Sequence, residues 1–147
     1  MFSHEVLRVV LIMLLLSLFA SAFAGSAHAQ EDWWPMYLHD PAHSGHSSSR
    51  APTTNDTVWT FSTGGNVQSS CAVVDGRVYF GSHDNNVYCL DASTGAPLWN
   101  YTTGSYVISS PAVYGGRVYV GSKDDKVYCL NATTGAFIWS YTTGYDV

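Results

Sequence analysis

One stretch of the sequence occurs twice, 40 residues apart. VYCLDASTGAPLW occupies residues 87–99, and VYCLNATTGAFIW occupies residues 127–139. The wider segments 59–98 and 99–138 align without a gap, with about 23 identities in 40 positions. A period near 40, in a chain of which 14% is aromatic, is typical of repeated four-stranded β units and not of a helical array.

Each unit contains four short runs of strand-forming residues separated by turns. In the first unit these runs are residues 67–74, 77–82, 86–92 and 97–104. Asp75-Gly76 predicts a type I′ hairpin, because both central residues of that turn need a positive φ, and Gly115-Gly116 meets the same demand in the second unit. Helical periodicity is found only in the leader. We therefore expect four antiparallel strands in each unit.

The expected strands lack a clean alternation of apolar and polar residues. Val78, Tyr79 and Phe80 are consecutive, and residues 87–90 are all apolar. Strands that are covered on both faces have this pattern, and stacked sheets produce it. The predicted fold class is all-β, with four-stranded antiparallel β-propeller blades at a period of 40. Two blades make an incomplete propeller, since a closed ring typically has about 4–8.

The first 29 residues have the features of a signal peptide. Arg8 precedes an apolar run, and small residues lead to Ala27-His28-Ala29, a cleavage pattern that would leave Gln30 first. A membrane anchor over residues 9–24 is the alternative, although a spanning helix needs about 20 residues. In both cases we expect the rest of the chain to be exported, as a secreted, cell-surface or periplasmic protein.

Charge and cysteine content exclude several classes of protein. The net charge is −5 and the basic residues are scattered, so no basic patch could follow a phosphate backbone and nucleic acid is not an expected partner. Cys71, Cys89 and Cys129 are odd in number and form no C-x-x-C, which argues against a disulfide framework and a zinc ribbon. We expect all three to be small buried hydrophobic residues.

The stretch from Leu90 to Trp99 resembles the L-D-A-x-T-G-x-x-x-W signature of the quinoprotein-like, or PQQ-like, β-propeller repeat. The copy from Leu130 to Trp139 departs from it only at Asn131. This repeat occurs in pyrroloquinoline quinone (PQQ) alcohol dehydrogenase-like enzymes and in the bacterial β-barrel assembly lipoprotein. The resemblance implies that the tryptophan docks between neighbouring blades and that the Thr-Gly turn sets up the contact. The matching residues are Trp59, Trp99, Trp139, Thr94, Gly95, Thr134 and Gly135, although Trp59 lacks the motif before it.

The resemblance also predicts how the chain is organised. Residues 30–58 are a lead-in segment, in which residues 34–45 are similar to the segment that packs ahead of the first blade in such propellers. Residues 59–98 and 99–138 are two blade repeats, and residues 139–147 are the start of a third. Two blades leave apolar faces and strand edges open. We therefore expect this chain to be part of a longer protein with further blades, or else to self-associate.

A PQQ site is not expected in this segment. The resemblance implies that such a site has adjacent cysteines in a disulfide ring, a carboxylate–metal site beneath the cofactor and a base. The sequence has no adjacent cysteines, and its acids lie at turn positions. It also has no arrangement of nucleophile and base that indicates catalysis. We therefore assign no catalytic or cofactor-binding residue and expect no cofactor.

Metal binding is only weakly indicated. His39, Asp40, His43 and His46 have side chains that suit a transition metal, but the lead-in segment already accounts for some of these positions, and we favour a packed or solvated loop. The Asp and Asn residues of segments 83–86 and 123–126 lack the density of a calcium loop, and we interpret them as hairpin turns.

Three N-x-S/T sequons predict sites of glycosylation. They begin at Asn55, Asn100 and Asn131. Asn131 lies beside an expected turn, whereas Asn100 lies in an expected strand. We therefore expect Asn131 to be the more accessible of these two.

The expected function is that of an exported, non-catalytic scaffold or binding module that presents its loops to a protein or glycan partner at the cell surface. Two alternatives stay open. One is a fragment of a quinoprotein dehydrogenase-like enzyme, with catalysis in other blades. The other is a component of envelope assembly, although Ala29 and Gln30 stand where a lipoprotein would have its cysteine. Membrane contact is expected only through the leader, if it is uncleaved.

Overall fold

The computed structural model describes residues 34–45, 53–145 and 147. All of them fall in the structural unit Asp32–Val147. The leader, its cleavage site and the alternative anchor lie outside the described residues, and so does His46. In the described part of the chain, no helix is long and apolar enough to cross a bilayer.

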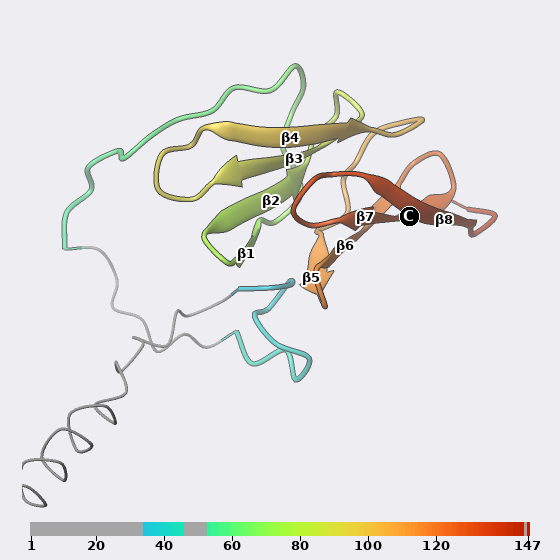
Figure 1. Ribbon diagram of the computed structural model, residues 1–147, viewed down its shortest axis with the longest axis horizontal. Helices are drawn as coiled ribbons and strands as arrows, with labels where there is room; N and C mark the ends of the chain where they lie inside the picture. The colour runs from blue at the N-terminus through green and yellow to red at the C-terminus, as the bar shows by residue number, and fades with distance from the viewer. Residues whose placement is uncertain (1–33, 46–52, 146) are drawn as a thin grey trace, which may run out of the picture. The chain divides into compact units, whose positions relative to one another are not determined.

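Eight strands form two separate four-stranded sheets (Figure 1). The first sheet contains β1 (Ala72–Val74), β2 (Arg77–Gly81), β3 (Asn86–Asp91) and β4 (Pro97–Thr102). The second contains β5 (Ala112–Tyr114), β6 (Arg117–Ser122), β7 (Lys126–Asn131) and β8 (Phe137–Thr142). In each sheet the spatial order follows the chain order and every pairing is antiparallel. The predicted all-β class and the four-stranded antiparallel blades are confirmed.

The two sheets repeat each other in register as well as in strand order. Tyr79 pairs with Cys89 and Cys89 with Trp99 in the first sheet, as Tyr119 pairs with Cys129 and Cys129 with Trp139 in the second. The hairpin turns have the expected backbone, with φ of 51° and 68° at Asp75-Gly76 and of 57° and 72° at Gly115-Gly116. A turn with two positive φ values matches the twist of the strands that it joins.

The sheets are framed differently from the sequence repeats. The predicted boundary between residues 98 and 99 falls inside β4, because Trp99 belongs to the outer strand of the first sheet. In the same way, residues 139–142 lie in β8 and complete the second sheet instead of starting a third unit. Of residues 139–147, Val147 corresponds to the entry into a next unit, because it lies against Gly121 as Val107 lies against Gly81.

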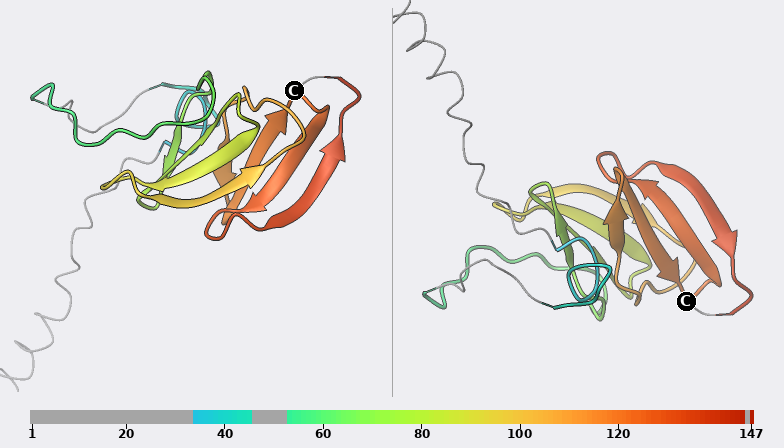
Figure 2. Two further views of the ribbon diagram at one scale, coloured as in Figure 1. Left: turned by 90° about the horizontal axis from the view of Figure 1, so that it is seen from above. Right: turned by 90° about the horizontal axis from the view of Figure 1, so that it is seen from below.

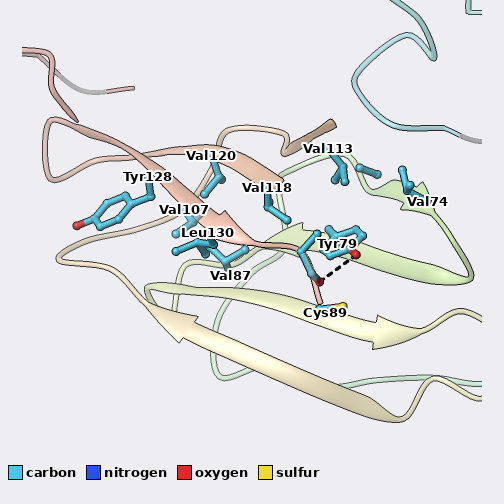
Figure 3. Packing of buried hydrophobic residues seen from close by; sticks show 12 residues of the cluster. Val74, Tyr79, Val87, Cys89, Val107, Val113, Val118, Val120, Tyr128 and Leu130 are labelled. Carbon is cyan, nitrogen blue, oxygen red and sulfur yellow. Dashed lines mark hydrogen bonds between the residues drawn. The ribbon is translucent and has the colours of Figure 1, made fainter. Parts of the chain in front are cut away.

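A hydrophobic core lies between the two sheets. Figure 2 shows the sheets side by side, and Figure 3 shows core residues from both. Residues Tyr79 to Gly81 of β2 are buried on both faces, as are Tyr128 to Leu130 of β7, which explains the apolar runs in the sequence. The core cluster consists of Ala72, Val74, Tyr79, Val87, Cys89, Val107, Val113, Val118, Val120, Tyr128, Leu130 and Ala132.

The three cysteines are free but do not share one environment. Cys89 and Cys129 are buried at equivalent positions of β3 and β7, whereas Cys71 is exposed. The expectation that all three are buried is therefore wrong for Cys71. It lies one residue before β1, at a position that proline occupies in the second unit.

The lead-in contacts both sheets. Trp34 and Val73 exchange two backbone hydrogen bonds, of 2.8 and 2.7 Å, along the free edge of β1. Next to it, the Pro35 carbonyl accepts a bond of 2.8 Å from the backbone N–H of Val113 in β5. Two adjacent residues thus pair with the first strands of both sheets and cover edges that would otherwise be open.

Candidate functional site

The contact between the sheets centres on the carbonyl oxygen of Ala132, which follows β7. Trp99 in β4 donates from indole Nε1 to this oxygen at 3.0 Å. Tyr79 in β2 donates from its hydroxyl to the same oxygen at 3.2 Å, as the dashed line in Figure 3 marks. The two rings lie 5.9 Å apart. One backbone carbonyl of the second sheet thus fixes two aromatic side chains of the first.

The turn after β7 shapes the surface on which Trp99 lies. The Asn131 side-chain oxygen accepts bonds of 2.9 Å from the backbone N–H groups of Thr133 and Thr134. Gly135 follows with φ of 71°, and a Cβ atom there would lie only 2.7 Å from the Trp99 ring. Glycine is required both by the left-handed backbone and by the close approach of the ring.

The same contact occurs on the first sheet, where Trp59 takes the place of Trp99. Trp59 Nε1 donates to the Ala92 carbonyl at 3.0 Å. Gly95 has φ of 70°, and a Cβ atom there would lie only 2.5 Å from the indole. Trp59 belongs to no strand in the described part of the chain. It docks on the first sheet, and among residues 34–45 and 53–58 no strand of a four-stranded sheet precedes it.

Trp139 has the same position in the second sheet but a different environment. It is 40% exposed, and all six residues of β8 are exposed. Among the described residues no third sheet covers it. Trp59 and Trp99 thus each dock on a neighbouring sheet, whereas Trp139 has no such partner among the described residues.

A second row of contacts, which the sequence analysis did not predict, crosses the opposite end of each sheet. The Asp84 carboxylate accepts bonds from the Tyr88 hydroxyl at 2.7 Å and from the Gly64 backbone N–H at 2.8 Å. Asp124 accepts from Tyr128 and, at 2.9 Å, from the Gly104 N–H. The signal in the sequence is the spacing D-x-x-x-Y after a strand, repeated at the period of 40.

Burial raises the pKa of Tyr88 and Tyr128 to about 12, and the bonded carboxylate of Asp84 or Asp124 adds to this effect. Burial acts to raise the pKa of the two carboxyl groups, but the hydrogen bonds that they accept outweigh it and lower their pKa. Both pairs therefore stay in their phenol and carboxylate forms near neutral pH. This suits a structural link and not proton transfer.

Asp91 also stabilises a turn, the one that follows β3. Its Oδ1 accepts bonds from Ser93 and Thr94, through both the backbone N–H groups and the hydroxyls, at 2.6 to 3.0 Å. The Ser93 hydroxyl, followed by that of Thr94, lowers the pKa of Asp91 from 3.8 to about 2. Asn131 accepts the equivalent backbone bonds without a charge. The negative charge at this position is therefore not needed to form the turn.

Of the four candidate metal ligands, the three described ones, His39, Asp40 and His43, lie in a tight loop. Leu38, His39 and His43 have positive φ. His39 lies edge-on to Trp34, with 4.9 Å between the ring centres. Asp40 accepts bonds from the hydroxyl and the backbone N–H of Ser44, in that order the largest causes that lower its pKa to about 2. Within residues 34–45, 53–145 and 147, no three His, Cys, Asp or Glu residues are grouped as metal ligands.

The sequons differ in exposure from the expected order. Asn55 is exposed, Asn100 is exposed in β4, and Asn131 is half-buried at the end of β7. The expectation that Asn131 is more accessible than Asn100 is wrong, because the Asn131 side chain faces its own turn. Asn100 Nδ2 donates to the Asn86 side-chain oxygen at 3.3 Å.

A family model described as outer membrane protein assembly factor BamB matches residues 46–146. No curated protein matches the chain. Among solved structures it is similar to BamB from Moraxella catarrhalis, with 23% identity and a TM-score of 0.54 over 58% of this chain and 26% of that one.

Two enzymes are similar as well. A europium-containing methanol dehydrogenase has 23% identity and a TM-score of 0.65 over 78% of this chain and 23% of its own. The quinohemoprotein alcohol dehydrogenase from Comamonas testosteroni has 25% identity and a TM-score of 0.65 over 80% and 20%.

The chain thus spans 20% to 26% of the length of these structures. They include an assembly factor and two dehydrogenases, so what they share with this chain is the repeat and its fold. The family model matches more than half of the chain. The chain belongs to the family of PQQ-like repeat proteins described as outer membrane protein assembly factor BamB.

Proposed function

We propose that this chain is an exported, non-catalytic binding module of the cell envelope that acts on protein partners. The observation that carries the proposal is the exchange of Asp91 for Asn131 with the turn unchanged. Asp91, the acid within the repeat signature, thus has a structural use. The description of the family as an assembly factor supports a protein partner in a larger assembly.

The residues of the two sheets do not fit a PQQ site. Cys89 and Cys129 are buried in different sheets and Cys71 is exposed, so no pair is placed to form the disulfide ring. Asp84, Asp91 and Asp124 accept hydrogen bonds from their own turns or from the neighbouring segment. We derive no step through PQQ for these residues.

The surface proposed for the partner is the end of the sheets where β2 joins β3 and β6 joins β7. There the His83 ring stacks on Tyr106, with 4.9 Å between centres and 9° between planes, and Tyr106 is 49% exposed. Lys123 occupies the position of His83 in the second unit. The residue at this turn position thus differs between the units while strand order and register stay the same, as expected of a scaffold that carries its specificity in loops.

A titration with PQQ in the presence of calcium tests the non-catalytic assignment. We expect no saturable change in PQQ absorbance, whereas a PQQ dehydrogenase measured alongside should saturate at a fixed stoichiometry. Stoichiometric binding by this chain would favour the alternative, a fragment of a dehydrogenase-like enzyme.

Fractionation of cells that produce the chain tests its location. We expect it in the envelope or periplasm with Gln30 as first residue by mass spectrometry, and recovery in the cytoplasm would contradict the proposal.

A further inference from the structure

Residues 59–64 have the sequence of an outer strand but belong to no sheet. Their sequence, WTFSTG, corresponds to WNYTTG at residues 99–104 and to WSYTTG at residues 139–144. The two later copies begin in β4 and β8, each of which is the fourth strand of a sheet. Residues 59–64 form no strand in the described part of the chain. The same sequence thus occurs twice with a sheet of its own and once without.

An outer strand of this chain has two kinds of contact. One kind reaches the next sheet, as when Trp99 in β4 donates to the Ala132 carbonyl of the second sheet. The other kind joins the strand to its own sheet, where Trp99 lies opposite Cys89 of β3. Because the two kinds involve different neighbours, residues 59–64 can be compared with β4 for each of them separately.

The contacts of residues 59–64 with the next sheet repeat those of β4. Trp59 donates to the Ala92 carbonyl at 3.0 Å, and the equivalent bond of β4 is also 3.0 Å long. The Gly64 backbone N–H donates to the Asp84 carboxylate at 2.8 Å, and the equivalent bond of β4 measures 2.9 Å. Residues 59–64 therefore lie on the first sheet as β4 lies on the second.

The contacts with a sheet of their own are missing, and Thr63 shows this directly. The equivalent Thr103 donates from its backbone N–H and its hydroxyl to the Asn85 carbonyl, in a turn of its own sheet, at 2.8 and 3.0 Å. Thr143 donates in the same way to the Asp125 carbonyl at 2.8 and 3.0 Å. Among the described residues Thr63 has no such turn to donate to. An open strand edge of this kind accepts another strand.

The repeat defines the partner that would fit this edge. Residues 99–102 and 139–142 lie opposite the x-V-Y-C runs of β3 and β7, so the partner is a sheet of three strands whose third strand has this pattern. A second copy of the two described sheets does not fit, because β4 and β8 already fill this place in both. The chain spans 20% to 26% of the length of the similar solved structures, which have room for further units.

We propose that residues 59–62 are the outer strand of a further sheet of this repeat, whose other three strands come from a part of the same polypeptide outside residues 1–147. Trp59 lies opposite the position that Cys89 has in β3, and Thr63 donates to the turn of that sheet. Because the first sheet already holds the segment in place, pairing has a smaller ordering cost than it would for a free strand. The inference does not depend on the proposed function.

Amide hydrogen exchange of the natural gene product, purified from the cells that make it, tests the proposal. Residues 59–62 should exchange no more than about tenfold faster than residues 99–102, because the amides of a paired strand exchange only when the sheet opens. Faster exchange than this would overturn the proposal. Mass spectrometry and sequencing of the same product test the source of the partner. We expect a last repeat unit that ends after its third strand. A product that ends at Val147, or a last unit with an outer strand of its own, would contradict the proposal.

A pair of matched variants of the same product supplies a second test. Thr103→Val removes the hydroxyl that bonds the Asn85 carbonyl, and Thr63→Val removes the equivalent hydroxyl. T63V should lower the melting temperature at least half as much as T103V, and a smaller loss would overturn the proposal. Y114S is the control, because Tyr114 is 83% exposed on β5 and its loss should change nothing. If a variant fails to fold, the exchange measurement on the unchanged product still decides. Binding of PQQ, which tests the proposed function, is independent of all these outcomes.

Discussion

Trp99 donates its indole hydrogen bond to the Ala132 carbonyl at 3.0 Å, across the boundary between the two sheets. The distance from Trp59 to Ala92 is the same, so the bond belongs to the repeat and not to one sheet. Because Tyr79 also donates to Ala132 at 3.2 Å, the carbonyl keeps a partner if the indole is lost. This limits the cost of removing the tryptophan donor.

We expect Trp99→Phe to lower the free energy of unfolding by about 1–2 kcal/mol. The change removes one hydrogen bond and part of a buried ring but does not orphan the carbonyl. Trp139→Phe is the matched control and should cost less than about 0.5 kcal/mol, since Trp139 is 40% exposed and lacks a neighbouring sheet among the described residues. Urea unfolding of dilute protein measures both. Equal losses would show that the contact does not stabilise the pair of sheets.

Gly135→Ala should be more damaging than the same change at Gly116. The two glycines have nearly equal φ, 71° and 72°, so both variants pay the left-handed backbone cost of about 1–2 kcal/mol. Only at Gly135 does the new Cβ meet Trp99, at 2.7 Å, whereas nothing lies within 4 Å at Gly116. We expect a further loss of about 1–3 kcal/mol from this overlap. Thermal unfolding of the two variants measures the difference directly, and its absence would mean that the indole moves aside freely.

The sequence predicted the fold because its local and long-range signals agree. The Asp75-Gly76 turn, the apolar runs and the repeated Leu90–Trp99 signature all point to the same four strands. The frame of the sheets was harder to predict, because a repeat in sequence has no preferred starting point. Trp99 lies in the last strand of the first sheet and docks on the second sheet. A repeat unit that is taken to begin at this tryptophan therefore has its boundary inside β4.

The remaining contacts depend on partners that lie outside the local pattern. The bond between Asp84 and Gly64 joins two segments 20 residues apart, and the bond between Pro35 and Val113 joins the lead-in to the second sheet outside the repeat. The exposure of Cys71 likewise depends on what covers the start of β1. Periodicity identifies which residues are apolar or turn-forming, but it does not identify which neighbour reaches them.

The turn between β6 and β7 offers a stabilising substitution, Lys126→Asn. In the first sheet, Asn86 donates to Asp84 Oδ1 from both its backbone and its side chain, each at 3.1 Å. In the second sheet Lys126 stands at the equivalent position, and the buried Asp124 Oδ1 has no hydrogen-bond partner. Supplying the amide donor should raise stability by about 0.5–1.5 kcal/mol.

The reverse change, Asn86→Lys, serves as the control and should be destabilising. The gain from Lys126→Asn should be larger at high salt, because the Lys126 charge, which lowers the pKa of Asp124, is then screened in the unchanged chain. Chemical unfolding at two ionic strengths measures this. A loss of stability at both would show that the lysine charge matters more than the missing hydrogen bond.

Asp91→Asn should remove part of the acid sensitivity of the fold. Hydrogen bonds from Ser93 and Thr94 hold the folded-state pKa of Asp91 at about 2, below its ordinary value of 3.8. A carboxyl group whose pKa is lowered by folding stabilises the fold above pH 3.8, and this contribution is lost as pH falls towards 2. The melting temperature should therefore fall less between pH 4 and pH 2 in D91N, and change little at pH 7, where Asn131 shows that an amide makes the same turn. The reciprocal variant N131D should add acid sensitivity in the second sheet. Asp40, whose pKa is also about 2, is unchanged in D91N and N131D, so the melting temperature of both variants should still fall somewhat between pH 4 and pH 2. Identical acid limbs in D91N, N131D and the unchanged chain would contradict the assignment of this titration to the turn.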